Sequence, residues 1–352
     1  MTILVWAAFL VFVLALVLLD LGVFHRTARP VGLREALGWT AFWVVLAMAF
    51  NGVVYLLYDR NWLGWTDHGA HSLSGSQAAL QFLAGYLIEK ALSVDNLFVI
   101  ALICTYFRVP AADQHRLLFW GILGAVVLRG LMIAAGAALI ARFEWTVYVF
   151  GVLLIASAVK MLLIRVEDLH PERNLLVRLA RRVFPVTNDY VGSKFFVRTP
   201  AGWAATPLLL ALLLVESSDV MFAIDSIPAI FAVTSDPFLV FTSNVFAILG
   251  LRSLYFALAG LLDLFRYLKP SLCALLAFVG VKMLLEHHYP ISTGASLGVV
   301  GGILATGILA SLIAPKRPAT ASPAPERADD SAEAVEKRPR PSATNQRGRE
   351  RP

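Results

Sequence analysis

The sequence has little charge and almost no cysteine for its length. Of 352 residues, 15% are Asp, Glu, Lys or Arg, two are Cys, and 58% are hydrophobic. Soluble domains have about 25% charged and 45–50% apolar residues, so this composition excludes a soluble enzyme and a disordered chain. Cys104 and Cys273 both lie inside apolar runs, which excludes a disulfide-stabilised secreted domain. The sequence also lacks a P-loop, a nucleophile elbow and a zinc-protease pattern, and we expect no enzyme activity.

Long apolar runs make up most of the chain. A hydrocarbon core about 30 Å thick needs about 20 apolar residues per helix. Runs of this kind lie at 2–20, 37–57, 77–105, 117–140, 145–164, 206–233, 237–261, 270–286 and 292–314. The sequence therefore predicts an all-α polytopic membrane protein with about nine transmembrane helices, and a lipid bilayer as its surroundings.

The connections between these runs are alternately rich and poor in Lys and Arg. The fifth connection, 165–205, carries seven basic residues, whereas the second and fourth carry only Arg60 and Arg142. The positive-inside rule then places the N-terminus outside and the C-terminus in the cytoplasm, and we expect the plasma (bacterial inner) membrane. The net charge of +6 is therefore a sign of topology, and no nucleic-acid partner is expected.

Two segments outside the spans have distinctive compositions. Residues 315–352 are rich in Pro, Ala, Glu, Arg and Ser and have no aromatic residue, which predicts a disordered cytoplasmic tail after a membrane domain at 1–314. The connection 165–205 mixes basic and aliphatic residues, and we expect it to lie along the cytoplasmic membrane interface.

An internal repeat connects two parts of the chain. Val159–Leu163 recurs as Val281–Leu285, and Leu128-Arg129 is matched by Leu251-Arg252. Asp95 and Asp225 also match, and each has a second acid six residues earlier, Glu89 and Asp219. The repeats, about 77–164 and 206–286, span three helices each. An odd number of spans reverses the direction of the second copy, so the pattern predicts an inverted-topology pair, as in many secondary transporters.

Ionisable residues inside the predicted spans indicate a functional site. A carboxylate at the bilayer centre costs about 2.5–3.5 kcal/mol, so buried acids must face one another, a cation or water. The acids are Glu89, Asp95, Glu216, Asp219 and Asp225, and the bases are Lys90, Arg129, Lys160, Arg252 and Lys282. Static ion pairs, a cation pathway and a proton relay are all compatible with this set.

Neutral oxygen-bearing side chains accompany these acids. Asn96, Ser226 and Asn244 lie at similar depth, and the set contains neither Cys nor His. Oxygen ligands suit Mn²⁺, Mg²⁺ or Ca²⁺. We also expect Pro228 to kink or interrupt its helix and so turn Asp225 towards the other acids.

Two motifs resemble those of the TerC family of integral membrane proteins. They are Glu89–Asn96 (EKALSVDN) and Glu216–Ala229 (ESSDVMFAIDSIPA), and the similarity continues through Asn244, Leu249–Arg252 and Val281–Met283. It covers nearly the whole chain to about residue 314. The family is named after tellurium-resistance operons, and its bacterial members, including the Alx branch, are regarded as manganese exporters. The resemblance implies metal homeostasis, Mn²⁺ as substrate with no permanently bound cofactor, and the five acids as the ion pathway.

The sequence leads to a specific transport hypothesis. Asp95 and Asp225 would be the central ligands during alternating access, and Glu89, Glu216 and Asp219 would supplement them or carry coupled protons. Four bases would neutralise the acids when metal is absent: Arg129, Lys160, Arg252 and Lys282. Two alternatives stay open, a non-transporting scaffold or insertion factor and a tellurite-type oxyanion transporter. The oligomeric state is also open.

Overall fold

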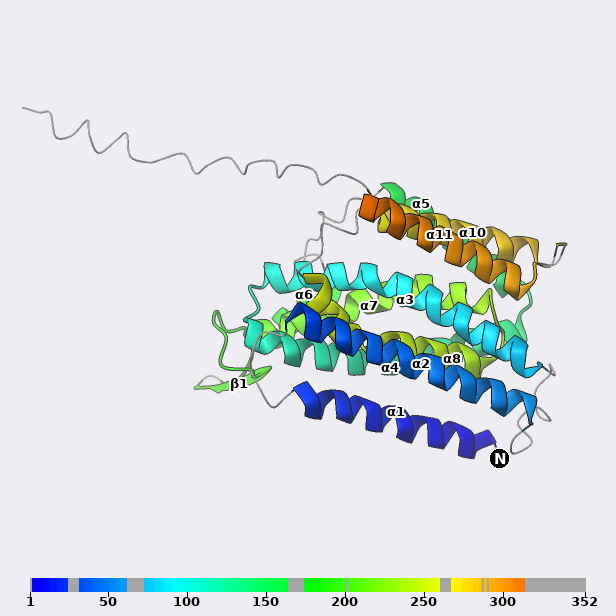
Figure 1. The fold of residues 1–352 in the computed structure, drawn as a ribbon. Helices are drawn as coiled ribbons and strands as arrows, with labels where there is room; N and C mark the ends of the chain where they lie inside the picture. Colours follow the sequence, from blue (N-terminus) through cyan, green and yellow to red (C-terminus); the bar gives the residue numbers. More distant parts are fainter. Residues whose placement is uncertain are drawn as a thin grey trace, which may run out of the picture. The chain divides into compact units, whose positions relative to one another are not determined.

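The computed structural model describes residues 2–24, 32–61, 73–163, 174–200, 202–259, 267–286, 288–289 and 291–313. The chain divides into two units, Met1–Ile313 and Ala314–Pro352. The second unit, with the predicted disordered tail, lies outside the described residues. Within the described residues the first unit is helical apart from one short hairpin, so the predicted all-α membrane class is confirmed (Figure 1).

Apart from the short helix Leu175–Val183, which lies in the predicted connection 165–205, the helices overlap the predicted apolar runs. They are α1 (Thr2–Phe24), α2 (Leu33–Asp59), α3 (Gly75–Tyr106), α4 (Ala111–Arg142), α5 (Thr146–Leu163), α6 (Leu175–Val183), α7 (Pro207–Phe231), α8 (Pro237–Ile248), α9 (Leu251–Ala259), α10 (Leu268–Leu285) and α11 (Thr293–Ile313). By length and apolarity, 7 segments of the described chain can cross a membrane: α2, α4, α5, α7, the α8–α9 pair, α10 and α11. The helix α3 is not among them, and it carries Glu89, Lys90 and Asp95. The total of nine spans stays a prediction.

The helix α8 lies at the centre of the packing. Every residue from Phe238 to Ile248 is buried, and α8 contacts α2, α3, α4 and α7. The helices α5, α10 and α11 form a neighbouring group, in which α10 packs against both of the others (Figure 1). This arrangement places α3, α4 and α7 around a buried helix, and these three helices carry the five predicted acids and Arg129.

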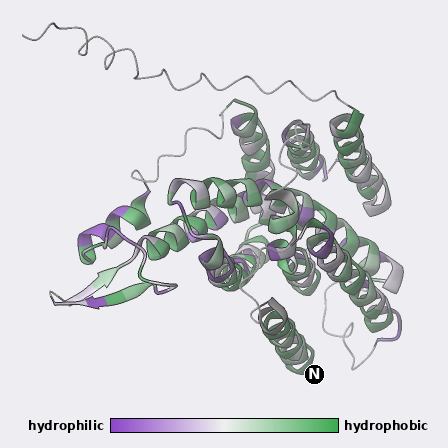
Figure 2. Ribbon diagram, turned by 60° about the vertical axis from the view of Figure 1, so that its left-hand side comes forward, coloured by the Kyte–Doolittle hydropathy of each residue, from purple (hydrophilic) through white to green (hydrophobic). Residues whose placement is uncertain are grey.

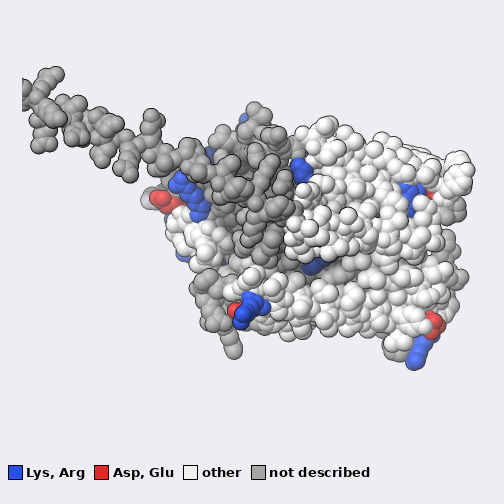
Figure 3. All heavy atoms as spheres, turned by 45° about the horizontal axis from the view of Figure 1, so that its top comes forward, with Lys and Arg blue, Asp and Glu red and all other residues white. Residues whose placement is uncertain are grey.

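The outer faces of the helices are apolar. Leu131 on α4, Leu162 on α5 and Leu312 on α11 all have more than half of their surface exposed. On the face drawn in Figure 3, charged side chains are sparse along the flank of the described helices. An exposed apolar flank with an internal polar cluster is the pattern expected of a protein surrounded by lipid.

The structure corrects the expected position of the helix break. The helix α7 continues through Pro228 and ends three residues later, at Phe231. The break falls instead between α8 and α9, where Gly250 has a φ of 82°. A β-carbon at Gly250 would lie 2.7 Å from Cδ1 of Trp43, so glycine satisfies both the backbone angle and the packing.

A folded segment precedes α7. It comprises α6 and an antiparallel hairpin of β1 (Phe196–Thr199) and β2 (Gly202–Ala205). The Tyr190 hydroxyl donates to the Phe107 carbonyl at 2.7 Å, and the Ser193 hydroxyl donates to Asp113 of α4. Burial raises the pKa of Tyr190 to about 12, so the hydroxyl remains a donor at neutral pH. These contacts attach the segment to the end of the α3–α4 pair.

Candidate functional site

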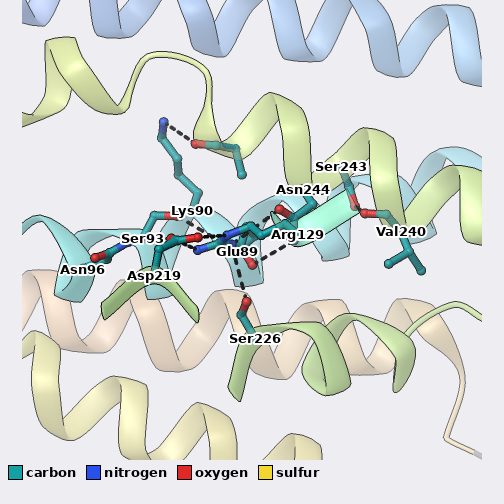
Figure 4. Close-up of polar contacts among 11 residues, drawn as sticks. Glu89, Lys90, Ser93, Asn96, Arg129, Asp219, Ser226, Val240, Ser243 and Asn244 are labelled. Atoms are coloured by element: carbon teal, nitrogen blue, oxygen red, sulfur yellow. Dashed lines mark hydrogen bonds and ion pairs between the residues drawn. The ribbon is translucent and has the colours of Figure 1, made fainter. Parts of the chain in front are cut away.

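Arg129 of α4 is the centre of the buried polar cluster. Its side chain donates to Asp219 of α7 through Nη2 at 2.8 Å and through Nε at 3.2 Å. Its Nη1 donates to Oε1 of Glu89 on α3. Arg129 is 2% exposed, Asp219 is 3% exposed and Glu89 is 0% exposed. One guanidinium therefore holds two carboxylates from two helices in a buried environment (Figure 4).

Neutral side chains complete the contacts around this ion-pair cluster. Asn96 donates to Oδ1 of Asp219 at 2.9 Å, and Asn244 donates to Oε2 of Glu89 at 3.3 Å. Nη1 of Arg129 also lies 3.4 Å from Oδ1 of Asn244 and 3.5 Å from the Ser226 hydroxyl. The three supporting residues expected from the sequence thus all border the cluster.

Two side-chain oxygens beside the cluster can accept further hydrogen bonds. Oδ1 of Asn96 and Oε2 of Glu216 are buried and have no hydrogen-bond partner among the described residues. Glu216 lies three residues before Asp219 on α7, so the two project from neighbouring positions of one helical face. Its carboxylate packs against Gly124 of α4, where a β-carbon would lie 2.1 Å from Oε1. Buried acceptors without donors are typical of sites that receive a cation or a proton.

Asp95 and Asp225 lie outside this cluster. Asp225 is partly buried and accepts a hydrogen bond from Ser157 of α5. Asp95 is partly buried and has no described contact with Arg129, Glu89 or Asp219. Among the residues that the structure describes, no three His, Cys, Asp or Glu side chains lie close enough to hold a metal ion. The role of these two aspartates as central ligands stays a prediction.

The four expected counter-ions have different environments. Only Arg129 is described in ion pairs with the predicted acids. Arg252 lies against His115, with Nη2 3.0 Å from Nδ1, and the Lys160 side chain is exposed. Lys282 is buried and donates to the Ala232 carbonyl at 2.8 Å.

Two lysines, the buried Lys282 and the partly buried Lys90, stabilise helix ends. Lys282 caps Ala232 at the C-terminus of α7, and Lys90 donates at 3.2 Å to the Ala247 carbonyl in the last turn of α8. Carbonyls at a helix C-terminus lack internal donors and favour a cation. The sequence did not predict these roles of Lys90 and Lys282, the hydrogen bond from Ser157 to Asp225, or the contact of Gly124 with Glu216. Only the Gly250 break had a signal in the sequence, a glycine inside an apolar run.

Two pairs of repeat-related residues contribute to this site. Glu89 and Asp219, which correspond in the sequence repeat, bind the same guanidinium. Asn96 and Ser226 also correspond: Asn96 donates to Asp219, and Ser226 lies 3.5 Å from Nη1 of Arg129. The inverted repeat itself stays a prediction, but the cluster joins equivalent residues of its two proposed halves.

The fold and this cluster define a class, a polytopic α-helical membrane protein with a buried charged site. Residues 74–319 match the family model described as "Integral membrane protein TerC family", and the chain belongs to this family.

Relatives resemble the chain over most of their length. The membrane protein STKORF319 of Myxococcus xanthus is 52% identical over 308 residues, which is 88% of this chain and 92% of that protein. The membrane-bound redox modulators named Alx of Escherichia coli K12 and Photorhabdus laumondii are 45% and 44% identical, covering 86% and 90% of this chain and 92% and 97% of theirs. No solved structure matches the chain.

Proposed function

We propose that the protein exports divalent metal cations, with Mn²⁺ as its cargo, from the cytoplasm through the Arg129 cluster. In this proposal it resides in the plasma (bacterial inner) membrane with its N-terminus outside and its C-terminus in the cytoplasm. The observation that carries the proposal is a buried cation, Arg129, held between Glu89 and Asp219 by oxygen ligands alone. The same oxygens suit a hard divalent ion.

Charge balance supports an exchange between the guanidinium and a metal ion. Two carboxylates and Arg129 have a combined charge of −1, whereas the same carboxylates with one divalent ion would be neutral. The unpartnered oxygens of Asn96 and Glu216 add ligands beside them. Transport would then require Arg129 to release Glu89, Asp219 or both as the ion enters. Glu216 would carry a coupled proton, and Asp95 and Asp225, which lie outside the cluster, would bind the ion at other steps of its passage.

The name of the Alx relatives, redox modulator, bears on this proposal. The chain has two cysteines, and both are buried free thiols. Burial keeps a thiol from exchange with a soluble partner. We propose that any redox effect of this protein follows from metal export.

The test is uptake of Mn²⁺ into inside-out vesicles at matched expression. We expect Glu89→Gln and Asp219→Asn each to lose about tenfold or more of the uptake rate, because each removes a charged buried contact. Asp225→Asn is expected to reduce uptake as well. Glu144→Gln and Asp189→Asn change exposed carboxylates and should transport as the wild type does.

Other outcomes would contradict the proposal. Wild-type rates in both Glu89→Gln and Asp219→Asn would overturn the site, and a wild-type rate in Asp225→Asn would remove Asp225 from the pathway. If the acids tolerate amidation while Arg129→Gln abolishes uptake of an oxyanion such as tellurite, the protein is an oxyanion transporter. No uptake by the wild type, across several divalent ions and with a proton gradient, would favour a membrane scaffold.

A further inference from the structure

The helix α6 has three distinct faces. Successive residues are about 100° apart around a helix. Val177 and Ala180 are buried and belong to the same apolar cluster as Leu208, Ala211 and Leu214 of α7. A second face is aliphatic but exposed: Leu175, Leu179 and Val183 are 72%, 54% and 61% exposed. The third face is basic, with Arg178, Arg181 and Arg182, all exposed.

The adjacent hairpin has the same combination of residues. Arg198 of β1 is paired with Trp203 of β2, and Trp203 is 60% exposed. Phe196 lies two residues before Arg198, on the same side of the strand, and is also exposed. The rings of Phe184 and Phe196 are 5.4 Å apart and link the end of α6 to the hairpin. Figure 2 shows hydrophilic and hydrophobic residues side by side on this helix and hairpin.

The charge of this segment has one dominant sign. Between residues 174 and 206 the sequence has five basic residues and one acid, Asp189. Aliphatic and aromatic side chains that are exposed beside arginines are typical of surfaces that enter the interface of an anionic membrane. The acyl region accepts the leucines and the tryptophan, while the phosphates accept the guanidinium groups.

Contacts with the N-terminal half of α7 fix the position of this segment. The segment leads directly into α7, whose first residue is Pro207. Asn174, the N-cap of α6, donates to the Ser217 hydroxyl of α7 at 2.8 Å, so the start of α6 is fixed against the α7 helix. A folded element held there presents its exposed aliphatic face outwards.

We propose that α6 and the β1–β2 hairpin form a binding surface for anionic phospholipids. The aliphatic face of α6 enters the acyl region, and Arg181, Arg182 and Arg198 bind lipid phosphates. The surface is separate from the Arg129 cluster, so the proposal does not depend on the transported substrate.

The test uses the full-length protein in nanodiscs, with a bimane fluorophore on Leu179→Cys. Both native cysteines are buried, so labelling is directed to the introduced thiol. We expect nitroxide-labelled lipid to quench the fluorophore and aqueous iodide to leave it largely unquenched. Leu175→Cys, on the same face, should behave in the same way.

Lipid selectivity is measured on the same protein by native mass spectrometry. We expect phosphatidylglycerol to be retained in preference to phosphatidylcholine, and Arg181→Gln/Arg182→Gln to weaken this preference on the order of tenfold. The matched control, Arg34→Gln/Arg142→Gln, removes two exposed arginines elsewhere and should retain it.

Three results would overturn the proposal. Iodide quenching at both Leu179→Cys and Leu175→Cys would show a solvated face. Protection of both from iodide and from lipid nitroxide would show that protein covers the face. A phosphatidylglycerol preference unchanged in the Arg181/Arg182 variant would place the anionic lipid elsewhere.

Discussion

Arg129 balances the charge of acids from two different helices. Glu89 and Asp219 are both essentially inaccessible to solvent, and their described ion pairs are with this one guanidinium. Bidentate contact with Asp219 fixes the plane of the guanidinium, which a lysine would not reproduce. Removing one partner of a buried pair costs about 3–5 kcal/mol because the other charge stays buried.

Arg129→Gln should therefore lower the free energy of unfolding by about 3–5 kcal/mol. Mn²⁺ should raise the melting temperature of this variant, because the two carboxylates then bind the ion without competition. At 100 times the dissociation constant, a ligand stabilises by about 2.7 kcal/mol. Thermal unfolding of the purified protein in detergent measures both effects, with the exposed Arg142→Gln as control. Unfolding of Arg129→Gln at the wild-type temperature would contradict this prediction.

Gly124→Ala should disturb Glu216 without changing any charge. The added methyl would lie 2.1 Å from Oε1 of Glu216 and would displace the carboxylate. We expect a loss of about 1–3 kcal/mol of stability, typical of overpacking, together with slower Mn²⁺ uptake. Gly298→Ala on α11 meets no atom within 4 Å and is the matched control. Equal uptake by the two variants would show that the position of Glu216 does not matter.

At the level of elements, residues on both sides of the α8–α9 break make polar contacts with neighbouring helices. The carbonyl of Ala247, in the last turn of α8, accepts a hydrogen bond from the ammonium of Lys90. Arg252, in the first turn of α9, points to His115 of α4. The polar contact before the break is thus with α3, and the polar contact after it is with α4.

Helix geometry explains which parts of the site the sequence could predict. The helical class follows from hydropathy, and the selection of Glu89 and Asp219, which are buried, follows from the cost of charge in lipid. A separation of six residues, however, turns a helix by about 240°, so Glu89 and Asp95 point in directions about 120° apart. The same holds for Asp219 and Asp225. The spacing in the sequence fixes the angle between the two side chains, but which of them faces Arg129 depends on how the helix packs against its neighbours.

Gly250→Ala should destabilise the protein by about 2–4 kcal/mol, from the left-handed backbone and the overlap with Trp43. Alanine is strained at the φ of 82°, and its β-carbon would lie 2.7 Å from Cδ1 of Trp43. Gly38→Ala, in the second turn of α2 where an added β-carbon meets no atom within 4 Å, should be neutral or slightly stabilising. Chemical unfolding of both variants checks the difference, and equal stability would show that this break tolerates a side chain.

At the level of the whole molecule, exposed charged residues mark the ends of the helices. Arg142 is the last residue of α4 and Glu144 lies in the short α4–α5 connection, whereas basic residues collect on α6. The positive-inside rule then assigns the α4–α5 connection to the outside and α6 to the cytoplasm.

Cysteine labelling in intact cells tests this orientation. A membrane-impermeant maleimide should modify Glu144→Cys from outside and leave Asp189→Cys unmodified until the cells are opened, because both positions are exposed. The wild type provides the background, because Cys104 and Cys273 are buried. Labelling of Asp189→Cys in sealed cells would show that the orientation is the reverse.

The single guanidinium at the centre also has a consequence for biogenesis. Ribosomes complete α3 and α4 before α7, so Glu89 and Arg129 reach the bilayer as a neutral pair, while Asp219 arrives later with no base of its own in the cluster. The second half of the protein thus depends on the first for its insertion. If the two halves were expressed as separate polypeptides, the first should accumulate alone, and the second should require its companion to escape proteolysis.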